Sequence, residues 1–310
     1  MKKTIILFVF MTISLLAVTQ NKPHQLFNGK DLNNWKMVPN DLPGFEVTDG
    51  VLVAKPRNGS NLFTEKWYGN YIFKFEYLLS KVGNSGALIR TDPKNAWGTG
   101  VEVQLLAPWT PYRDDLHCTG SMYGLVAVHN RPDETTGIWH EMEIKCDRQN
   151  VTISVDGQIT TTAKIDTVKG MENKNIVGAV GFQGNHGQDG EFVKFRNISI
   201  IDFDVEPDYV AKGFYEEDVR FREQAYKAAV SIGAPMIEPL IQMLSEENVM
   251  AHAGAKQVLF DIIAKATAPD VDKRDKKNVI KILKQSSSKQ TYSKSVSDYL
   301  NWLLTMAKSK

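Results

Sequence analysis

The sequence has little cysteine and almost no net charge. Its 310 residues include only two cysteines, and the formal net charge at pH 7 is +1. No Cys-x-x-Cys motif occurs and no histidine pair stands at helical spacing, so the common zinc-binding patterns are absent. A charge so close to zero gives no electrostatic reason to expect nucleic acid or an anionic membrane as the main partner.

Long hydrophobic runs are also missing beyond the first twenty residues. There, Lys2-Lys3 precede an apolar stretch from Ile5 to Val18, which is the pattern of a secretory signal peptide. We therefore expect a signal peptide over residues 1–20 and a secreted or periplasmic mature protein. No membrane span is expected after it, because a spanning helix needs about 20 apolar residues.

Export permits a disulfide, and the two cysteines of the chain are Cys118 and Cys146. They could pair, or Cys146 could be a small buried side chain in a strand. Because a chain of this length can bury a full core without a cross-link, we expect both thiols to be free.

Residues 24–204 have the pattern of an all-β domain. The run from Tyr71 to Tyr77 alternates aromatic and charged side chains, as in a strand buried on one face. Asp49-Gly50 and Asp156-Gly157 are hairpin turn signals between short alternating runs. About a dozen such strands, with no helix between them, predict a two-sheet sandwich.

Residues 210–310 change to helical periodicity and predict a smaller all-α domain. Apolar residues recur at helical spacing from Val219 to Ile232, and Gly233-Ala234-Pro235 ends that helix and starts another. The arrangement resembles a HEAT-like helical hairpin, although a small bundle packed on the sandwich is an equally good interpretation. No catalytic groups are evident there, and the helices are a candidate docking surface for a protein partner.

Polar groups able to do chemistry gather between residues 84 and 123. The side-chain period of a strand places Glu102 and Gln104 on one face, and if their strand neighbours the one that ends near Arg90, all three converge on one patch. Amphipathic side chains that suit a sugar ring surround the two strands. They are Trp97, Trp109, Tyr112, His117 and Tyr123.

Several motifs occur in order along residues 26–203. They are Leu26 to Trp35, Asn84-Ser85-Gly86 with Arg90, Gly100 to Gln104, Thr119-Gly120 with Tyr123, Trp139, Gly181-Phe182-Gln183, and Phe195 to Ile198. Together they resemble the 3-keto-disaccharide hydrolase family, also known as domain of unknown function 1080. Two departures bear on substrate choice: Leu105 to Ala107 follow Gln104 where many relatives carry an aspartate, and Trp139-His140 replaces the usual Trp-Asn.

The resemblance implies a concanavalin A-like jelly-roll sandwich with its site on the concave sheet. It also implies a secreted carbohydrate-active enzyme that cleaves glycosides or disaccharides oxidised at C3. A C3 ketone makes the C2 proton acidic, so a base can remove it and expel the C1 group, and water can then add to complete a net hydrolysis. Such a site needs a general base, donors for the enolate oxygen, and an acid or water for the leaving group.

We assign Glu102 as the base, with His117, His140 and His186 as rivals. Arg90 and Gln104 are expected to face the ketone or enolate oxygen, and Tyr123 to bind the sugar or assist the leaving group. The alternative for Glu102 and Arg90 is an ion pair that only holds the sheet face. His140 alternates with core residues and could instead point inward. The expected substrate-binding residues are Asn84, Trp97, Trp109, His140, Gln183 and His186.

Two other functions compete with this assignment. A retaining glucanase would need a second carboxylate about 5 to 5.5 Å from the first, and Gln104 holds the partner position. A non-catalytic carbohydrate-binding module with a helical docking tail is the alternative from another class. No cofactor is expected. Glu102, His117 and Asp114 or Asp115 carry atoms that suit a divalent metal, yet nothing in their spacing demands one.

Overall fold

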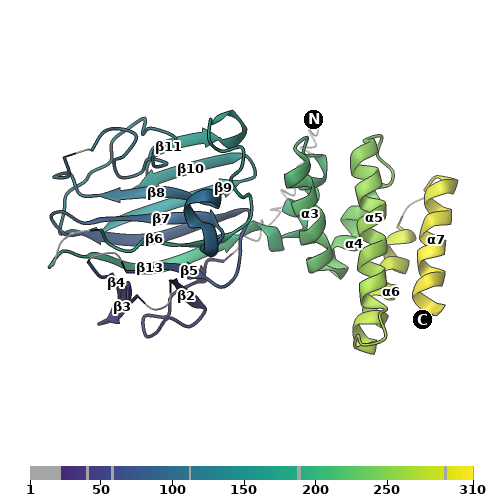
Figure 1. Ribbon diagram of the computed structural model, residues 1–310. Coiled ribbons are helices and arrows are strands. Elements are labelled where there is room, and N and C mark those ends of the chain that lie inside the picture. The colour runs from purple at the N-terminus through teal and green to yellow at the C-terminus, as the bar shows by residue number, and fades with distance from the viewer. Residues whose placement is uncertain are drawn as a thin grey trace, which may run out of the picture.

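A computed structural model describes residues 22–39, 42–56, 59–111, 113–186, 190–289 and 292–309. Two antiparallel sheets form a sandwich, and the C-terminal helices are stacked at one end of it (Figure 1). This confirms the expected mainly β jelly-roll sandwich with an α-helical tail. The predicted signal peptide lies outside the described residues.

The larger sheet has eight strands in the order β11-β10-β9-β6-β13-β4-β3, with β1 paired to β13. Its long central strands, β6 and β13, begin at Tyr71 and Val193, which are far apart in the sequence. The sheet can therefore be completed only when nearly the whole domain is present. The strands are β1 (His24–Gln25), β3 (Phe45–Thr48), β4 (Val51–Ala54), β6 (Tyr71–Leu79), β9 (His140–Asp147), β10 (Asn150–Val155), β11 (Gln158–Lys164) and β13 (Val193–Asp202).

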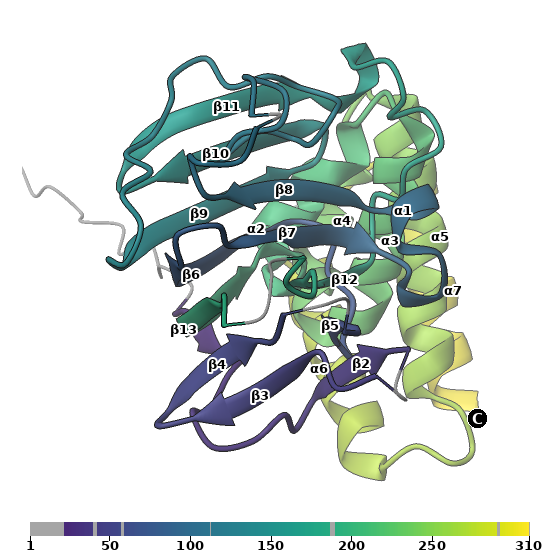
Figure 2. The same ribbon diagram turned by 60° about the vertical axis from the view of Figure 1, so that its left-hand side comes forward.

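The smaller sheet has five strands in the order β2-β5-β12-β7-β8. Figure 2 shows β7 and β8 running side by side across it. A short helix, α1 (Ala96–Thr99), connects these two strands. The five strands are β2 (Trp35–Val38), β5 (Asn61–Thr64), β7 (Asn84–Thr91), β8 (Val101–Leu106) and β12 (Ala179–Phe182).

Both predicted hairpin turns are present. Asp49 and Gly50 have φ angles of 51° and 79°, and Asp156 and Gly157 have φ angles of 49° and 77°. Two consecutive positive φ angles define the type I′ turn, which aspartate and glycine tolerate better than other residues. These turns fix the β3–β4 and β10–β11 pairings.

The core lies between the two sheets and is rich in aromatic rings. Phe182 of the smaller sheet stacks on Phe195 of the larger one with ring centroids 4.0 Å apart, and the Phe75 ring meets it edge-on at 5.0 Å. Cys146 is buried in β9 and Cys118 in the loop after β8, and both thiols are free, as expected.

The C-terminal helices have their own apolar core. Helix α3 begins after Asp218, whose side chain accepts a hydrogen bond from the Arg220 amide, and ends at Gly233, whose φ of 76° stops the helix where the sequence predicts. No helix in the described part of the chain is long and apolar enough to cross a membrane. The helices are α2 (Pro207–Lys212), α3 (Val219–Ile232), α4 (Ile237–Met243), α5 (Val249–Ala266), α6 (Lys273–Ser287) and α7 (Lys294–Ser309).

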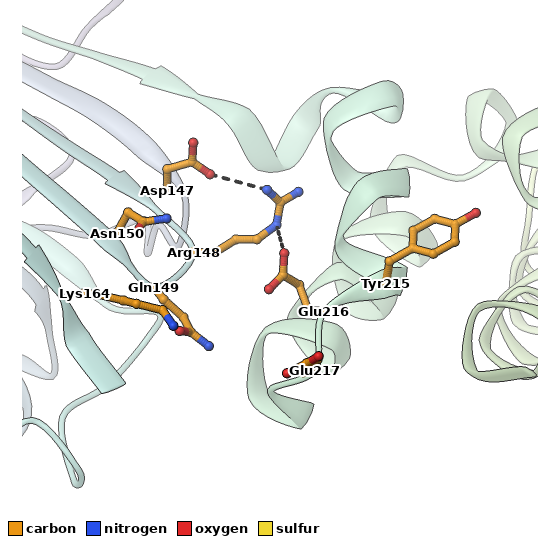
Figure 3. Close-up of a pocket in the computed structure, with 8 residues that line it drawn as sticks. All are labelled: Asp147, Arg148, Gln149, Asn150, Lys164, Tyr215, Glu216 and Glu217. Carbon is orange, nitrogen blue, oxygen red and sulfur yellow. Dashed lines mark hydrogen bonds and ion pairs between the residues drawn. The ribbon is translucent and has the colours of Figure 1, made fainter. Parts of the chain in front are cut away.

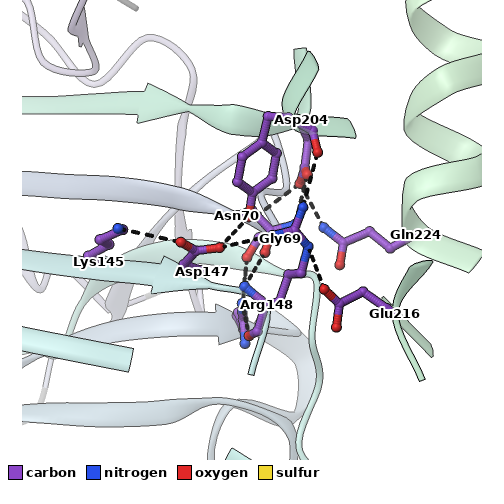
Figure 4. A network of polar contacts seen from close by, with 10 residues as sticks. Gly69, Asn70, Lys145, Asp147, Arg148, Asp204, Glu216 and Gln224 are labelled. Carbon is purple, nitrogen blue, oxygen red and sulfur yellow. Dashed lines mark hydrogen bonds and ion pairs between the residues drawn. The ribbon is translucent and has the colours of Figure 1, made fainter. Parts of the chain in front are cut away.

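A polar network joins the sandwich to the helices (Figure 4). Arg148, in the turn between β9 and β10, donates to the Tyr209 carbonyl at 3.0 Å and pairs with Glu216 at 3.1 Å. Asp204 accepts hydrogen bonds from Asn70 of the sandwich and from Gln224 of α3. A cavity of about 390 Å³ lies beside Arg148, and Figure 3 shows Arg148 reaching from the sandwich turn toward Glu216. The helices are therefore anchored to one end of the sandwich.

Candidate active site on the five-stranded sheet

The outer face of β7 and β8 carries the predicted patch. Val101, Val103 and Leu105 point into the sandwich core, so Glu102 and Gln104 point outward. The strands are neighbours, as the prediction required: Gly86 lies opposite Gln104, and Leu88 opposite Glu102.

Glu102 lies over Gly86, and the missing side chain of this glycine makes room for it. A Cβ atom at position 86 would come within 2.3 Å of the Glu102 Oε1 atom. Burial raises the pKa of the Glu102 carboxyl to about 8, because a charged carboxylate loses solvation there. A carboxyl group that titrates near neutral pH can exchange protons with a substrate.

Tyr123 lies on the same outer face as Glu102. Val103, which follows Glu102 on β8, and Met122, which precedes Tyr123 on the returning loop, form a bridge, and both point into the core. The Tyr123 amide also donates to the Glu102 carbonyl at 2.9 Å. His117 packs edge-on against the Tyr123 ring at a centroid distance of 4.8 Å. The structure therefore brings Glu102, Tyr123 and His117 together.

Asp114 orients His117 and was missed as a hydrogen-bonding partner from the sequence. Its Oδ1 atom lies 2.6 Å from His117 Nδ1, and this hydrogen bond is the main cause that lowers the pKa of the Asp114 carboxyl. An ionised aspartate at Nδ1 favours the tautomer whose Nε2 atom accepts a proton. The Asp-x-x-His spacing in a loop was the available signal.

Two glutamines flank Gly86. Gln104 lies directly across from Gly86 on β8, and the backbone N–H of Gln183 donates to the Gly86 carbonyl from the β12 side at 2.8 Å. Gln183 follows the inward-facing Phe182, so its side chain is on the outer face. Both glutamines are almost fully buried. They are placed to supply neutral hydrogen-bonding groups beside the Glu102 carboxyl.

Asn84 and His186 lie at the start of β7. The His186 amide donates to the Asn84 carbonyl at 2.8 Å, and the Asn84 amide donates to the side chain of Asn185 at 3.2 Å. Asn185 is fully buried and also donates to the Glu191 carbonyl, so it shapes the loop that carries His186. Partial desolvation lowers the pKa of the His186 imidazole. No sequence motif pointed to Asn185.

The two expected sugar platforms flank β8. Trp97 belongs to α1, directly before this strand, and Trp109 follows it in the next loop. Both indoles are largely exposed and free to contact a ring. Tyr112 lies outside the described residues.

The structure does not bring Arg90 into this patch, contrary to expectation. Its φ angle of 51° breaks the strand alternation at the end of β7. The guanidinium turns toward the helices and donates to the carbonyls of Gly69, at 2.8 Å, and Arg148, at 3.0 Å. It also lies over the Phe221 ring of α3. The alternative of a Glu102–Arg90 ion pair is not formed either.

His140 is also away from the patch. It lies in β9 of the larger sheet, stacks on Tyr77 and is only 3% exposed. Its Nδ1 atom is 2.6 Å from Asp156, and its Nε2 atom is 2.8 Å from the Thr135 carbonyl. Both ring nitrogens are occupied within the fold, so the inward orientation considered from the sequence is the one observed.

The patch offers one carboxylate among neutral polar groups. Glu102 is the single acid among the outward positions of β7 and β8, where Gln104, Asn84 and Gly86 stand nearby. Among the described residues, no three histidine, cysteine, aspartate or glutamate side chains come together as a metal site would require. This arrangement suits proton transfer to or from a bound sugar by a single carboxyl group.

Comparison with known proteins places this fold among carbohydrate-related structures. A family model described as a 3-keto-alpha-glucoside-1,2-lyase-like domain matches residues 22–201. A crystal structure of a candidate glycosyl hydrolase from Parabacteroides distasonis is 25% identical, with a TM-score of 0.51 over 58% of this chain and 98% of that chain. A second candidate glycosyl hydrolase from the same organism is 25% identical, with a TM-score of 0.49 over 57% and 92% of the two chains. No curated protein matches this chain.

Proposed function

This chain belongs to the 3-keto-alpha-glucoside-1,2-lyase-like domain family, and from that premise we propose that it cleaves the glycosidic bond of 3-keto-glycosides or 3-keto-disaccharides. The reaction begins with removal of the C2 proton, which the neighbouring ketone makes acidic. The electron pair left at C2 forms an enolate, and elimination then expels the C1 aglycone. Water adds across the new double bond to complete a net hydrolysis.

The observation that carries this proposal is the single carboxyl group of Glu102 above Gly86. Burial raises its pKa to about 8, which is close to the value that suits a general base working near neutral pH. Ordinary retaining glycosidases need two carboxylates, and the next outward position on β8 is occupied by Gln104. A substrate already activated by a ketone needs only one base.

The neighbouring groups have distinct roles in this scheme. The amides of Gln104 and Gln183 stabilise the oxygen that gains charge as the C2 proton leaves, because hydrogen bonds to that oxygen strengthen as its charge grows. Tyr123, whose backbone is hydrogen-bonded to Glu102, and the His117–Asp114 pair beside it serve the leaving group. Trp97 and Trp109 contact the sugar rings. The proposal also includes a signal peptide over residues 1–20 and a secreted or periplasmic mature protein.

The first test is whether cleavage requires the C3 ketone of the substrate. Purified protein should release the aglycone from a 3-keto-disaccharide and leave the parent disaccharide intact, because without the ketone the C2 proton is not acidic. Chromatographic measurement of both sugars over time, with a no-enzyme control, gives the comparison. Equal turnover of the two sugars would contradict the proposal.

The pH dependence of kcat/KM should show the titration of Glu102. Since burial raises its pKa to about 8, the active carboxylate form is scarce at pH 6 and dominant at pH 9. We expect kcat/KM to rise about tenfold per pH unit from pH 6 and to level off above about pH 8. Initial rates, corrected for spontaneous elimination, and circular dichroism at each pH provide the measurement and its control. A rate that falls above pH 8 would assign Glu102 as the acid instead.

A further inference from the structure

A second cavity, called the junction cavity below, lies where the sandwich meets helix α3. Its volume is about 610 Å³, within the range of about 300–1,000 Å³ that is typical of small-molecule sites. One wall comes from the sandwich segments 66–69, 175–177 and 202–205, and the other from the side of α3 that carries Gln224 and Lys227. Neither Glu102 nor Tyr123 lines it.

The indole of Trp67 stands between this cavity and another. It lines the junction cavity and also a neighbouring cavity of about 520 Å³ that is bordered by Met37, Pro39 and Pro93. Trp67 is 47% exposed, so its ring is available on the surface. An exposed indole beside polar side chains is the usual platform for the apolar face of a pyranose ring.

Charges around the junction cavity cancel. Three basic and three acidic side chains line it, so their formal charges sum to zero. They are Lys66, Arg220, Lys227, Asp202, Asp204 and Glu223. Lys66 and Asp202 pair at 2.8 Å. A balanced set of donors and acceptors does not favour an anion or a cation. It suits a neutral ligand that carries many hydroxyl groups.

Gln224 adds a fixed polar group to the α3 wall. Its Nε2 atom donates to Asp204 at 2.7 Å, which sets the orientation of the amide. Its buried Oε1 atom has no hydrogen-bond partner among the described residues. A buried acceptor without a partner is unfavourable, and a small shift of the amide would let a ligand hydroxyl donate to it.

We propose that this junction cavity, with Trp67 as its platform, is a second carbohydrate-binding site that takes a neutral oligosaccharide. It is separate from the Glu102 site and does not take part in cleavage. The family match ends at residue 201, and the P. distasonis structure with a TM-score of 0.51 covers 58% of this chain. The α3 wall lies beyond that matched domain, so the helical tail completes the site and retains the enzyme on a glycan.

Binding of unoxidised sugars tests the proposal without relying on turnover. The full chain is titrated with maltotetraose, cellotetraose and laminaritetraose by isothermal titration calorimetry, with trigalacturonate as an anionic comparison. At least one neutral tetrasaccharide should bind more tightly than trigalacturonate. Trp67→Ala should weaken that binding about tenfold or more, and Trp67→Phe should restore most of it because the ring face is kept.

Trp302→Ala is the matched control, because Trp302 on α7 is 50% exposed and outside both cavities. It should leave binding unchanged, and so should Glu102→Gln. Failure of every neutral tetrasaccharide to bind at millimolar concentration, or equal affinity of Trp67→Ala and the wild type, would overturn the second site. Absence of turnover on 3-keto-disaccharides would overturn only the proposed reaction.

Discussion

The substitution Glu102→Gln is expected to reduce kcat on a 3-keto-disaccharide by a factor of about 10²–10⁴, the range typical of a lost general base. The substitution keeps the shape of the side chain but removes its ability to accept the C2 proton. Binding of the 3-keto-disaccharide should survive, because the amides and aromatic rings around position 102 are unchanged. Single-turnover kinetics and calorimetric titration of the variant separate the two effects.

The Glu102→Gln variant should keep its fold, because Glu102 binds a proton more tightly in the folded protein than in the unfolded chain. The pKa of Glu102 is raised in the folded state, so the folded protein binds a proton that the unfolded chain has released between about pH 4.5 and 8. Ionised Glu102 therefore lowers stability as the pH rises through that window. Glutamine removes this penalty, and the variant should be at least as stable as the wild type at pH 9.

Glu143→Gln is the matched control for position 102. Glu143 lies in β9 of the larger sheet, outside the patch, and its replacement should leave kcat and KM unchanged. Unchanged turnover in Glu102→Gln would remove Glu102 from the mechanism. Loss of both turnover and substrate binding would assign Glu102 to substrate binding instead. A wild type that binds sugar and never cleaves it would support the alternative function, a non-catalytic carbohydrate-binding module.

The substitution Arg90→Met is expected to lower the free energy of unfolding by about 2–4 kcal/mol. Arg90 is only 3% exposed, and its guanidinium is the donor to the buried carbonyl of Gly69 and the partly buried carbonyl of Arg148. Methionine fills much of the same space but leaves both carbonyls without this donor. Urea unfolding followed by tryptophan fluorescence measures the change.

Arg274→Met is the matched control for position 90. The Arg274 side chain is almost fully exposed on α6, where it pairs with Asp272, so this change should leave the urea midpoint unaltered. Folded Arg90→Met should keep kcat near the wild-type value. A large loss of kcat with unchanged stability would return Arg90 to the active site and contradict the orientation observed here.

Local patterns in the sequence predicted the elements well, because each is decided by neighbouring residues. The Asp-Gly pairs at 49–50 and 156–157 form the expected hairpin turns, since few other residues accept two positive φ angles. Gly233 ends α3 because glycine readily accepts the positive φ of 76° at that position. The outward direction of Glu102 followed from strand alternation with Val101 and Val103, and it was correct.

Long-range packing decided what the sequence could not. The alternation rule placed Arg90 beside Glu102, but the positive φ of Arg90 and its acceptors at Gly69 and Arg148 come from parts of the fold far away in sequence. His140 likewise depends on Asp156, a turn residue across the hairpin.

The sequence by itself determined the two-sheet sandwich, the helical tail and Glu102 as the leading candidate for the base. These follow from periodicity, turn chemistry and family motifs, all of which are local in the chain. Only the tertiary structure decided that Glu102 fits over Gly86, that Asp114 holds His117, and that Trp67 and α3 enclose a cavity. Those contacts join residues from separate strands, loops and helices, and burial acts on a pKa only after the chain has packed.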